Sequence, residues 1–240
     1  MKTAICFAGT GRSLEHTHLS LKKNLIDCFS ECDVFILAPE GIHSHKVKEF
    51  FSKHDRVKGI IIEKESEPDL TGLRFRPAWP DPTRSSRQIY MKMIIARSRL
   101  GKIISEYESD NKFEYDRVIF SRMDVLYFSP IGNIIKNLDM NYLHVPDFHN
   151  TFGGVVDGLN DRFAVGSRGD MGQYFKIPDS IGLFISAGGE IHAETFLKWH
   201  LENNEVRVLK SPIRFTRVKP GGIEEDRRIE NRNNWNFGDT

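Results

Sequence analysis

Apolar runs of strand length alternate with stretches of helical periodicity along the first half of the chain. The runs that predict strands are residues 2–8, 34–38, 59–62 and 115–120. The stretches with apolar positions three or four residues apart, which predict helices, are residues 14–28, 47–51 and 89–107. We expect Ser13 to cap the first of these helices. Strands that alternate with helices are typical of a parallel sheet covered by helices on both faces.

The second half of the chain has a weaker pattern. It predicts strands at 142–145, 162–165 and 206–209, a glycine-rich loop at 152–158 and a helix at 194–202. No linker separates two apolar cores, so the sequence predicts a single α/β domain over residues 1–219. Residues 220–240 are mainly charged residues and asparagine, and we expect a flexible polar tail because they cannot bury enough apolar surface to fold alone.

A long irregular segment, residues 63–84, interrupts the alternation. It contains four prolines and has no periodicity. Loops of this length inside a compact domain are usually functional or disordered. The segment and the start of the next helix are locally basic, with Arg74, Arg76, Arg84 and Arg87. Arg87 is therefore a candidate for binding an anionic ligand.

Composition narrows the class of protein. The 240 residues include 34 Lys and Arg against 33 Asp and Glu, a formal net charge of +1, which argues against nucleic acid as a partner. No apolar run approaches the ~20 residues of a transmembrane helix, and the apolar start of the chain is too short for a signal peptide. Three cysteines without disulfide-framework spacing are typical of a reducing compartment. We expect a cytoplasmic protein, and peripheral membrane contact stays open.

Polar residues follow the predicted strands at the positions where parallel α/β sheets bind ligands. The turn Gly9-Thr10-Gly11-Arg12 follows the first strand and offers backbone amides and a guanidinium group to a diphosphate or a base. The alternative is a tight turn that needs glycine for its backbone conformation.

Asp124 follows the apolar strand at 115–120. A carboxylate there has no packing value, and Mg²⁺ or Mn²⁺ prefers oxygen ligands, so Asp124 is a candidate metal ligand. Alternatively, Asp124 pairs with Arg122 or caps the next turn.

Several segments resemble small bacterial and viral GT-A glycosyltransferases. Residues 5–12 and 32–36 are similar to the family's Gly-x-x-Arg turn and its Asp-Val-Phe strand. Residues 115–124 and 160–167 are similar to its Tyr-Asp-x-Val-Ile-x-x-Arg-x-Asp and Asn-Asp-x-Phe-Ala-x-Gly segments, and residues 194–201 resemble a helix that begins with glutamate. The matches occur in the family's order and extend to about residue 210.

The resemblance implies a single-domain, Rossmann-like GT-A fold and transfer of a sugar from a nucleotide-sugar donor to a saccharide or glycan acceptor, in surface polysaccharide or glycan synthesis. It places Asp124 at the last position of the family's Asp-x-Asp motif, as a ligand of Mn²⁺ or Mg²⁺, and Arg122 at the first. The residues expected to bind the donor are Gly9, Thr10, Gly11, Arg12, Arg87, Arg122 and Arg214, with Arg217 as the alternative to Arg214 for stabilising the charge on the departing diphosphate.

An inverting enzyme, which the available carboxylates favour, also needs a base for the acceptor's proton. Asp161 is the first candidate because it lies in a matched segment and directly precedes a strand. Its alternative role is an ion pair with Arg162 or Arg168. Asp157 and Glu194 are the other candidate bases, and His192 is a candidate late metal ligand.

Two other functions remain open. A sugar-phosphate nucleotidyltransferase also begins with a strand and a glycine loop, but that class carries a Pro-Lys pair that this sequence lacks after Gly11. A non-catalytic nucleotide- or glycan-binding protein of the same fold would explain the missing first aspartate of the metal motif.

Overall fold

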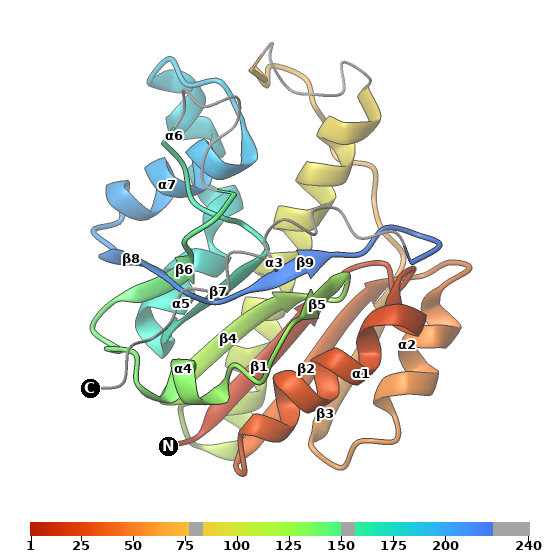
Figure 1. The fold of residues 1–240 in the computed structure, drawn as a ribbon. Coiled ribbons are helices and arrows are strands. Elements are labelled where there is room, and N and C mark those ends of the chain that lie inside the picture. Colours follow the sequence, from red (N-terminus) through yellow and green to blue (C-terminus); the bar gives the residue numbers. More distant parts are fainter. Residues whose placement is uncertain (77–83, 150–156, 223–240) are drawn as a thin grey trace.

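The computed structural model describes residues 1–76, 84–149 and 157–222, so residues 77–83, 150–156 and 223–240 are outside the described part. Most of the predicted glycine-rich loop and nearly all of the predicted tail fall in these gaps. The central sheet has seven strands in the order β3-β2-β1-β4-β7-β6-β8 (Figure 1). Their bounds are β1 Thr3–Ala8, β2 Cys32–Pro39, β3 Val57–Glu63, β4 Arg117–Arg122, β6 Leu143–Pro146, β7 Phe163–Ser167 and β8 Val208–Ser211.

Strand direction divides the sheet into two parts. The strands β3, β2, β1 and β4 are all parallel, whereas β7 runs antiparallel to its neighbours β4 and β6. At the far edge, β8 is parallel to β6. The mostly parallel α/β sheet predicted from the sequence is therefore confirmed, and so are the strands predicted in both halves.

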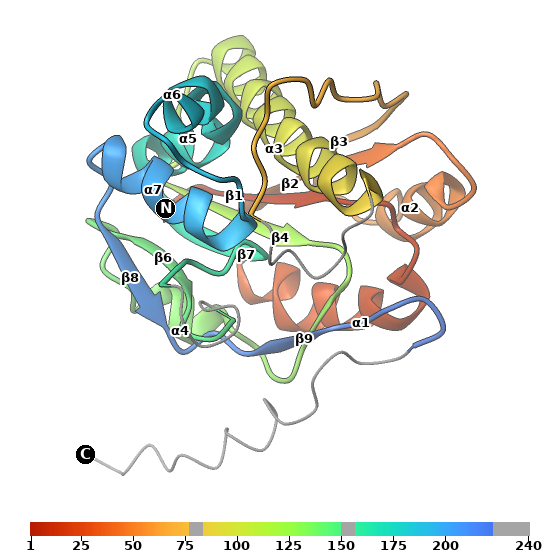
Figure 2. The ribbon, with the colours of Figure 1, turned by 90° about the horizontal axis from the view of Figure 1, so that it is seen from above.

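Helices cover both faces of the sheet. Figure 2 shows the sheet with α3 on one face and α1 on the other. The α-helices are α1 Leu14–Asn24, α2 Ser44–Phe51, α3 Arg84–Asn111, α4 Gly132–Lys136, α5 Arg168–Phe175, α6 Ile181–Ser186 and α7 Ala193–Asn203. The described residues also form two short 3-10 helices, Ile26–Cys28 and Ile177–Ser180. The sequence pattern missed α4, α5 and α6, which are only five to eight residues long.

The alternation of side chains along the strands produces two apolar cores. In β1, Ala4, Cys6 and Ala8 face the core formed with α3, α5, α6 and α7. The intervening Ile5 and Phe7 face the core formed with α1, α2 and α4. Both faces of a central parallel strand are thus buried, which explains why β1 is a continuous apolar run in the sequence.

A second, two-stranded sheet lies over α1. It pairs β5 (Val125–Tyr127) antiparallel to β9 (Phe215–Arg217). The hydroxyl of Ser13 donates to the carbonyl of Val218 at 2.7 Å, and Thr17 donates to the carbonyl of Met123 at 2.7 Å. The expected capping role of Ser13 was therefore wrong, because its side chain makes no cap hydrogen bond in α1. These bonds hold the start of α1 against the residues that follow β4 and β9.

Helix α3 is longer than predicted and presents a different face. Ile89, an expected core position, is 64% exposed, whereas Tyr90, Ile94 and Arg97 are buried. The buried positions 90, 94, 97, 100 and 104 are three or four residues apart, so they lie on one face of the helix. Core packing therefore selects the face that contains an arginine.

Residues 64–76 cross from β3 toward the start of α7. Phe75 forms a parallel bridge with Ile191, and the amide of Arg76 donates to the carbonyl of Ile191 at 3.1 Å. Figure 1 shows α6, α7 and the start of α3 (yellow) projecting above the sheet. Among the described residues, no helix combines the length and apolar character needed to cross a membrane.

Candidate functional site

The turn after β1 adopts a conformation that requires glycine. Gly9 and Gly11 have φ values of 148° and 67°, and a Cβ at Gly11 would lie 2.6 Å from Cγ2 of Val47. The amide of Gly9 donates to the carbonyl of Leu37 at 3.3 Å, so this amide is already occupied. The tight-turn interpretation of the two glycines is confirmed, and Thr10 of the same turn is exposed.

Asp124, just past the end of β4, is held by two arginines. Arg122 donates from Nε to Oδ1 at 2.8 Å and from Nη2 to Oδ2 at 2.7 Å, while Nε of Arg217 donates to Oδ2 at 3.0 Å. Burial alone would raise the pKa of Asp124, but the two guanidinium groups outweigh it and hold the pKa well below its usual range. Asp124 is therefore an ionised carboxylate, and its predicted pairing with Arg122 is confirmed.

A third arginine faces this pair from the turn after β1. Arg12 is half-buried, and it interacts electrostatically with Asp124, Arg122 and Arg217. Within residues 1–76, 84–149 and 157–222, no hydrogen bond or ion pair engages its guanidinium group. We call Arg12, Arg122, Asp124 and Arg217 the arginine cluster. Its three positive charges and one negative charge leave an excess of two positive charges.

A second group of charged side chains forms around Asp161. Arg97 is fully buried, and its Nη2 lies 3.1 Å from Oδ2 of Asp161 and also donates to the carbonyl of Asp161. Burial would raise the pKa of Asp161, but Arg97, followed by Arg122 and Arg162, lowers it. Asp161 is thus an ionised structural partner of Arg97, a residue that the sequence alternatives did not include.

Glu194 lies beside this buried pair in the first turn of α7. Burial and then the negative charge of Asp161 raise the pKa of Glu194 to about 7. Its side chain is 23% exposed, and its Oε2 lies 3.4 Å from Nε2 of His192. Burial, followed by the charge of Arg76, lowers the pKa of His192. We call Arg97, Asp161, His192 and Glu194 the carboxylate cluster.

The two clusters are adjacent. The sulfur of Met93 lies 3.7 Å from Nη2 of Arg97 and 3.4 Å from Nη1 of Arg122. The amide of Arg122 donates to the carbonyl of Arg162, and the amide of Leu159 donates to the carbonyl of Glu194. The segment before β7 therefore connects the end of β4 to the start of α7. As a result, the excess positive charge of the arginine cluster lies next to Glu194, whose carboxyl group has a pKa of about 7.

Three of the predicted site residues have other partners. Asp157 is exposed and pairs with Lys198 at 2.5 Å and Lys210 at 3.3 Å, and hydrogen bonds from these lysines lower its pKa. Arg214 pairs with Asp147, and Arg87 lies over the ring of Phe75 at 5.2 Å from its centroid. The roles predicted for these three residues stay predictions.

The arrangement at Asp124 does not suit a divalent ion. Both carboxylate oxygens already accept hydrogen bonds from guanidinium groups, whose positive charges would repel a cation. In the described part of the chain, no group of three or more His, Cys, Asp or Glu side chains could hold a metal. His192 lies against Glu194 instead. The expected Mn²⁺ or Mg²⁺ at Asp124 and His192 stays a prediction that experiment can test.

Arg97 was not among the site residues predicted from the sequence, whereas Arg217 was predicted as the alternative to Arg214. Arg97 occupies a core position of α3, and a charged residue at an apolar-face position is a signal that the sequence does contain. Arg217 lies three residues from the predicted Arg214, and only the pairing of β9 with β5 decides which of them reaches Asp124.

Residues 1–219 match the family described as "Domain of unknown function (DUF7796)", and the chain belongs to this family. No curated protein matches the sequence. Among solved structures, an active-site mutant of LgtC is similar with a TM-score of 0.51 and 13% identity, over 86% of this chain and 72% of LgtC. Mouse xyloside xylosyltransferase 1 is similar with a TM-score of 0.51 and 10% identity, over 88% of this chain and 85% of that one.

The glycosyltransferase GlyE of Streptococcus pneumoniae TIGR4 matches with a TM-score of 0.46 and 14% identity, and the chain spans 45% of its length. At these identities the comparisons show the fold, which is the GT-A glycosyltransferase fold expected from the sequence.

Proposed function

We propose that this protein is a glycosyltransferase that moves a sugar from a nucleotide-sugar donor to a hydroxyl group of a saccharide or glycan acceptor, in surface polysaccharide or glycan synthesis. The observation that carries the proposal is that the arginine cluster, at the ends of β1 and β4, lies next to the carboxylate cluster, with Met93 in contact with both. One cluster has excess positive charge, and the other contains a carboxyl group with a pKa of about 7. The shared fold of LgtC and the mouse xylosyltransferase supports it.

The chemistry of glycosyl transfer assigns a role to each cluster. As the bond between the sugar and the diphosphate breaks, negative charge develops on the departing nucleoside diphosphate, and the arginine cluster stabilises that charge. The acceptor hydroxyl loses a proton as it attacks the sugar. Glu194 is the base that takes this proton, since a base is most effective when its pKa is near the working pH.

The other two candidate carboxylates fit the role of base less well. Asp161 is occupied by Arg97 and has a lowered pKa, and Asp157 is exposed and bound to two lysines. Asp161 acts through its negative charge, which helps to raise the pKa of Glu194. A single base that is not a nucleophile favours inversion of configuration at the transferred sugar.

The test is to incubate the protein with a panel of uridine, guanosine and thymidine diphosphate sugars and to measure release of nucleoside diphosphate with and without saccharide acceptors. We expect one donor to be consumed, and Glu194→Gln to lower kcat by about 10²–10⁴-fold.

Glu202→Gln is the matched control, because Glu202 lies on the same helix but is exposed and paired with Lys198. Consumption of no donor, or equal activity of Glu194→Gln and the control, would contradict the proposal. Release of pyrophosphate from a nucleoside triphosphate and a sugar phosphate would favour a nucleotidyltransferase.

A further inference from the structure

Both carboxylate oxygens of Asp124 accept hydrogen bonds from arginine side chains. Oδ1 accepts one hydrogen bond and Oδ2 accepts two, all from Arg122 and Arg217. The side chain of Asp124 is only 11% exposed, and those of Arg122 and Arg217 are 19% and 23% exposed. A carboxylate in this position serves to hold two guanidinium groups in a fixed orientation.

The turn after β1 offers a guanidinium group to a phosphate. The amide of Gly9 is bonded to Leu37, so the turn after β1 does not offer that donor. Arg12, in the same turn, has a half-buried guanidinium group that no described residue engages by a hydrogen bond or ion pair. Its positive charge adds to those of Arg122 and Arg217. Guanidinium groups bind phosphate oxygens through paired, charge-assisted hydrogen bonds.

We infer that Arg12, Arg122 and Arg217 hold the diphosphate of the donor without a divalent ion, and that Asp124 is a positioning residue that orients Arg122 and Arg217. This inference rests on the proposed function and specifies how the same site binds its donor. The excess of two positive charges in the arginine cluster neutralises negative charge on the diphosphate, which a metal ion would otherwise do.

Calorimetric titration with UDP, GDP and inorganic pyrophosphate tests the inference, with each ligand titrated once in EDTA and once in MnCl2. At least one ligand is expected to bind, with Kd values that agree within about threefold between the two conditions. Arg12→Gln should weaken binding by about tenfold or more in both, as for a lost hydrogen bond to a charged group. Binding that appears only with MnCl2, or is more than about tenfold tighter with it, would overturn the inference.

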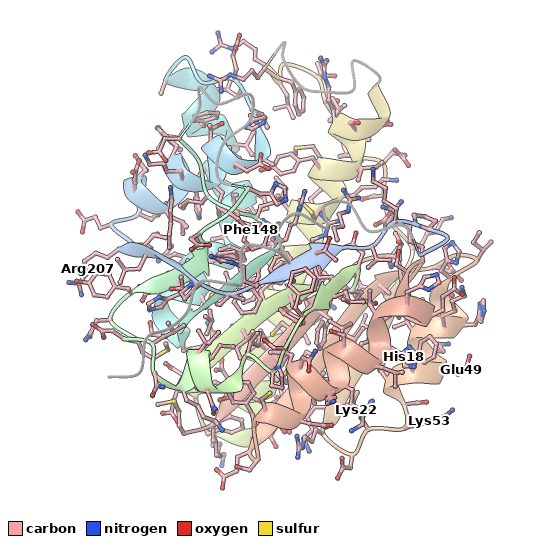
Figure 3. The ribbon with its side chains drawn as sticks, viewed as in Figure 1. His18, Lys22, Glu49, Lys53, Phe148 and Arg207 are labelled. Carbon is pink, nitrogen blue, oxygen red and sulfur yellow. The ribbon has the colours of Figure 1, made fainter. Side chains whose placement is uncertain are left out.

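Arg207→Gln is the matched control for the loss of one positive charge. Arg207 precedes β8, stacks on Tyr142 at 4.8 Å from the ring centroid, and lies at the outer edge of the molecule, away from Phe148 near the centre of Figure 3. The Kd of Arg207→Gln for the ligand that binds the wild-type protein should stay within about twofold of the wild-type value. A loss equal to that of Arg12→Gln would show that only overall charge matters and would overturn the specific role of Arg12.

A double-mutant cycle tests the positioning role of Asp124. Arg217→Gln should weaken pyrophosphate binding by about tenfold in the wild type but by less than about threefold in an Asp124→Asn background, because Arg217 has then already lost its orientation. Equal losses in both backgrounds would overturn the positioning role. Asp124→Asn should also change Kd by the same factor in EDTA and MnCl2, whereas a loss confined to MnCl2 would identify Asp124 as a metal ligand.

The outcomes separate this inference from the proposed function. Binding that requires Mn²⁺, together with sugar transfer, would leave the glycosyltransferase in place and remove the inference. Metal-independent binding without consumption of any nucleotide sugar would support the inference and remove the proposed function. Failure of all three ligands to bind would overturn both.

Discussion

The arginine cluster and the carboxylate cluster contain the same chemical groups in opposite proportions. In the arginine cluster, three arginines surround Asp124, and the pKa of Asp124 lies far below its usual value. In the carboxylate cluster, the one arginine, Arg97, pairs with Asp161. Among the described residues, no arginine or lysine pairs with Glu194, and burial, followed by the charge of Asp161, raises its pKa to about 7.

The comparison shows that burial and the number of guanidinium groups around a carboxylate together set its pKa. An excess of arginines fixes a carboxylate as an ion and leaves positive charge for an anionic ligand. A shortage leaves one carboxyl group free to gain and lose a proton near neutral pH. The four predictions that follow test this contrast, from the largest expected effect to the smallest.

Removal of Arg97 should have the largest effect on folding. Arg97→Met leaves the buried Asp161 without its partner and should lower the free energy of unfolding by about 3–5 kcal/mol. Arg122→Met should cost about half as much or less, because Asp124 keeps Arg217. Urea denaturation of both variants measures the difference. If Arg97→Met fails to fold, Arg97→Lys, which keeps the charge, should recover a folded protein. Equal losses for Arg97→Met and Arg122→Met would show that the two clusters do not differ in this respect.

The rate of transfer should depend on the ionisation of Glu194. Because the base must be deprotonated, kcat should rise with pH to a plateau with a midpoint near pH 7, and about 100-fold between pH 5 and the plateau. The residual activity of Glu194→Gln should lack this midpoint, whereas Glu202→Gln should keep it. A midpoint near pH 7 that persists in Glu194→Gln would assign the titration to another group.

Stability should fall as the pH rises through the same range. The folded Glu194 keeps its proton up to about pH 7, whereas an unperturbed glutamate loses it near 4.5, so folding takes up a proton between these values. The stabilisation is complete below pH 4.5 and is lost as the pH passes 7. The wild type should therefore lose about 1–3 kcal/mol of unfolding free energy between pH 5 and pH 8 that Glu194→Gln does not lose, so the difference between the variant and the wild type should shift by this amount in favour of the variant. A difference that stays constant over this range would contradict the raised pKa.

Asp157 lies outside both clusters and should show the smallest effect. Asp157→Asn removes an exposed ion pair with Lys198 and Lys210, so Tm should stay unchanged within measurement error. Its kcat should also match the wild type, in contrast to Glu194→Gln. A large loss of kcat in Asp157→Asn would restore Asp157 as a candidate base.

Much of the fold could be predicted from local patterns. The strands β1, β2 and β4 are apolar because both of their faces are buried, and this burial is visible as continuous apolar runs, whereas the apolar run of the edge strand β3 is only partly buried. Short elements such as β5 and β9, of three residues each, have no periodicity of their own. They form because each pairs with the other and covers α1. A three-residue strand carries too few positions to be distinguished from a loop by pattern alone.

Part of the geometry of the candidate site could be predicted. Arg122 ends β4, Asp124 follows β4 and Arg12 follows β1, and because these strands are parallel neighbours the proximity of the three residues could be expected from the topology. Glu194 could be proposed, but its pKa depends on Asp161 and on burial, which no local pattern shows. The position of Arg97 on the apolar face of α3 is visible in the sequence, but its partner, Asp161, is known only from the structure.

By itself, the sequence determined the parallel sheet, the glycine turn after β1 and the carboxylate after β4, because strand burial, positive φ values and turn chemistry are local properties of the chain. Only the tertiary structure decided which arginine serves which carboxylate. The partners Arg217 and Asp124 are 93 residues apart, and Arg97 and Asp161 are 64 apart. The sequence contains 34 Lys and Arg against 33 Asp and Glu, and packing distributes the arginines and carboxylates unequally between the two clusters, so their charge and proton affinity arise only in the folded chain.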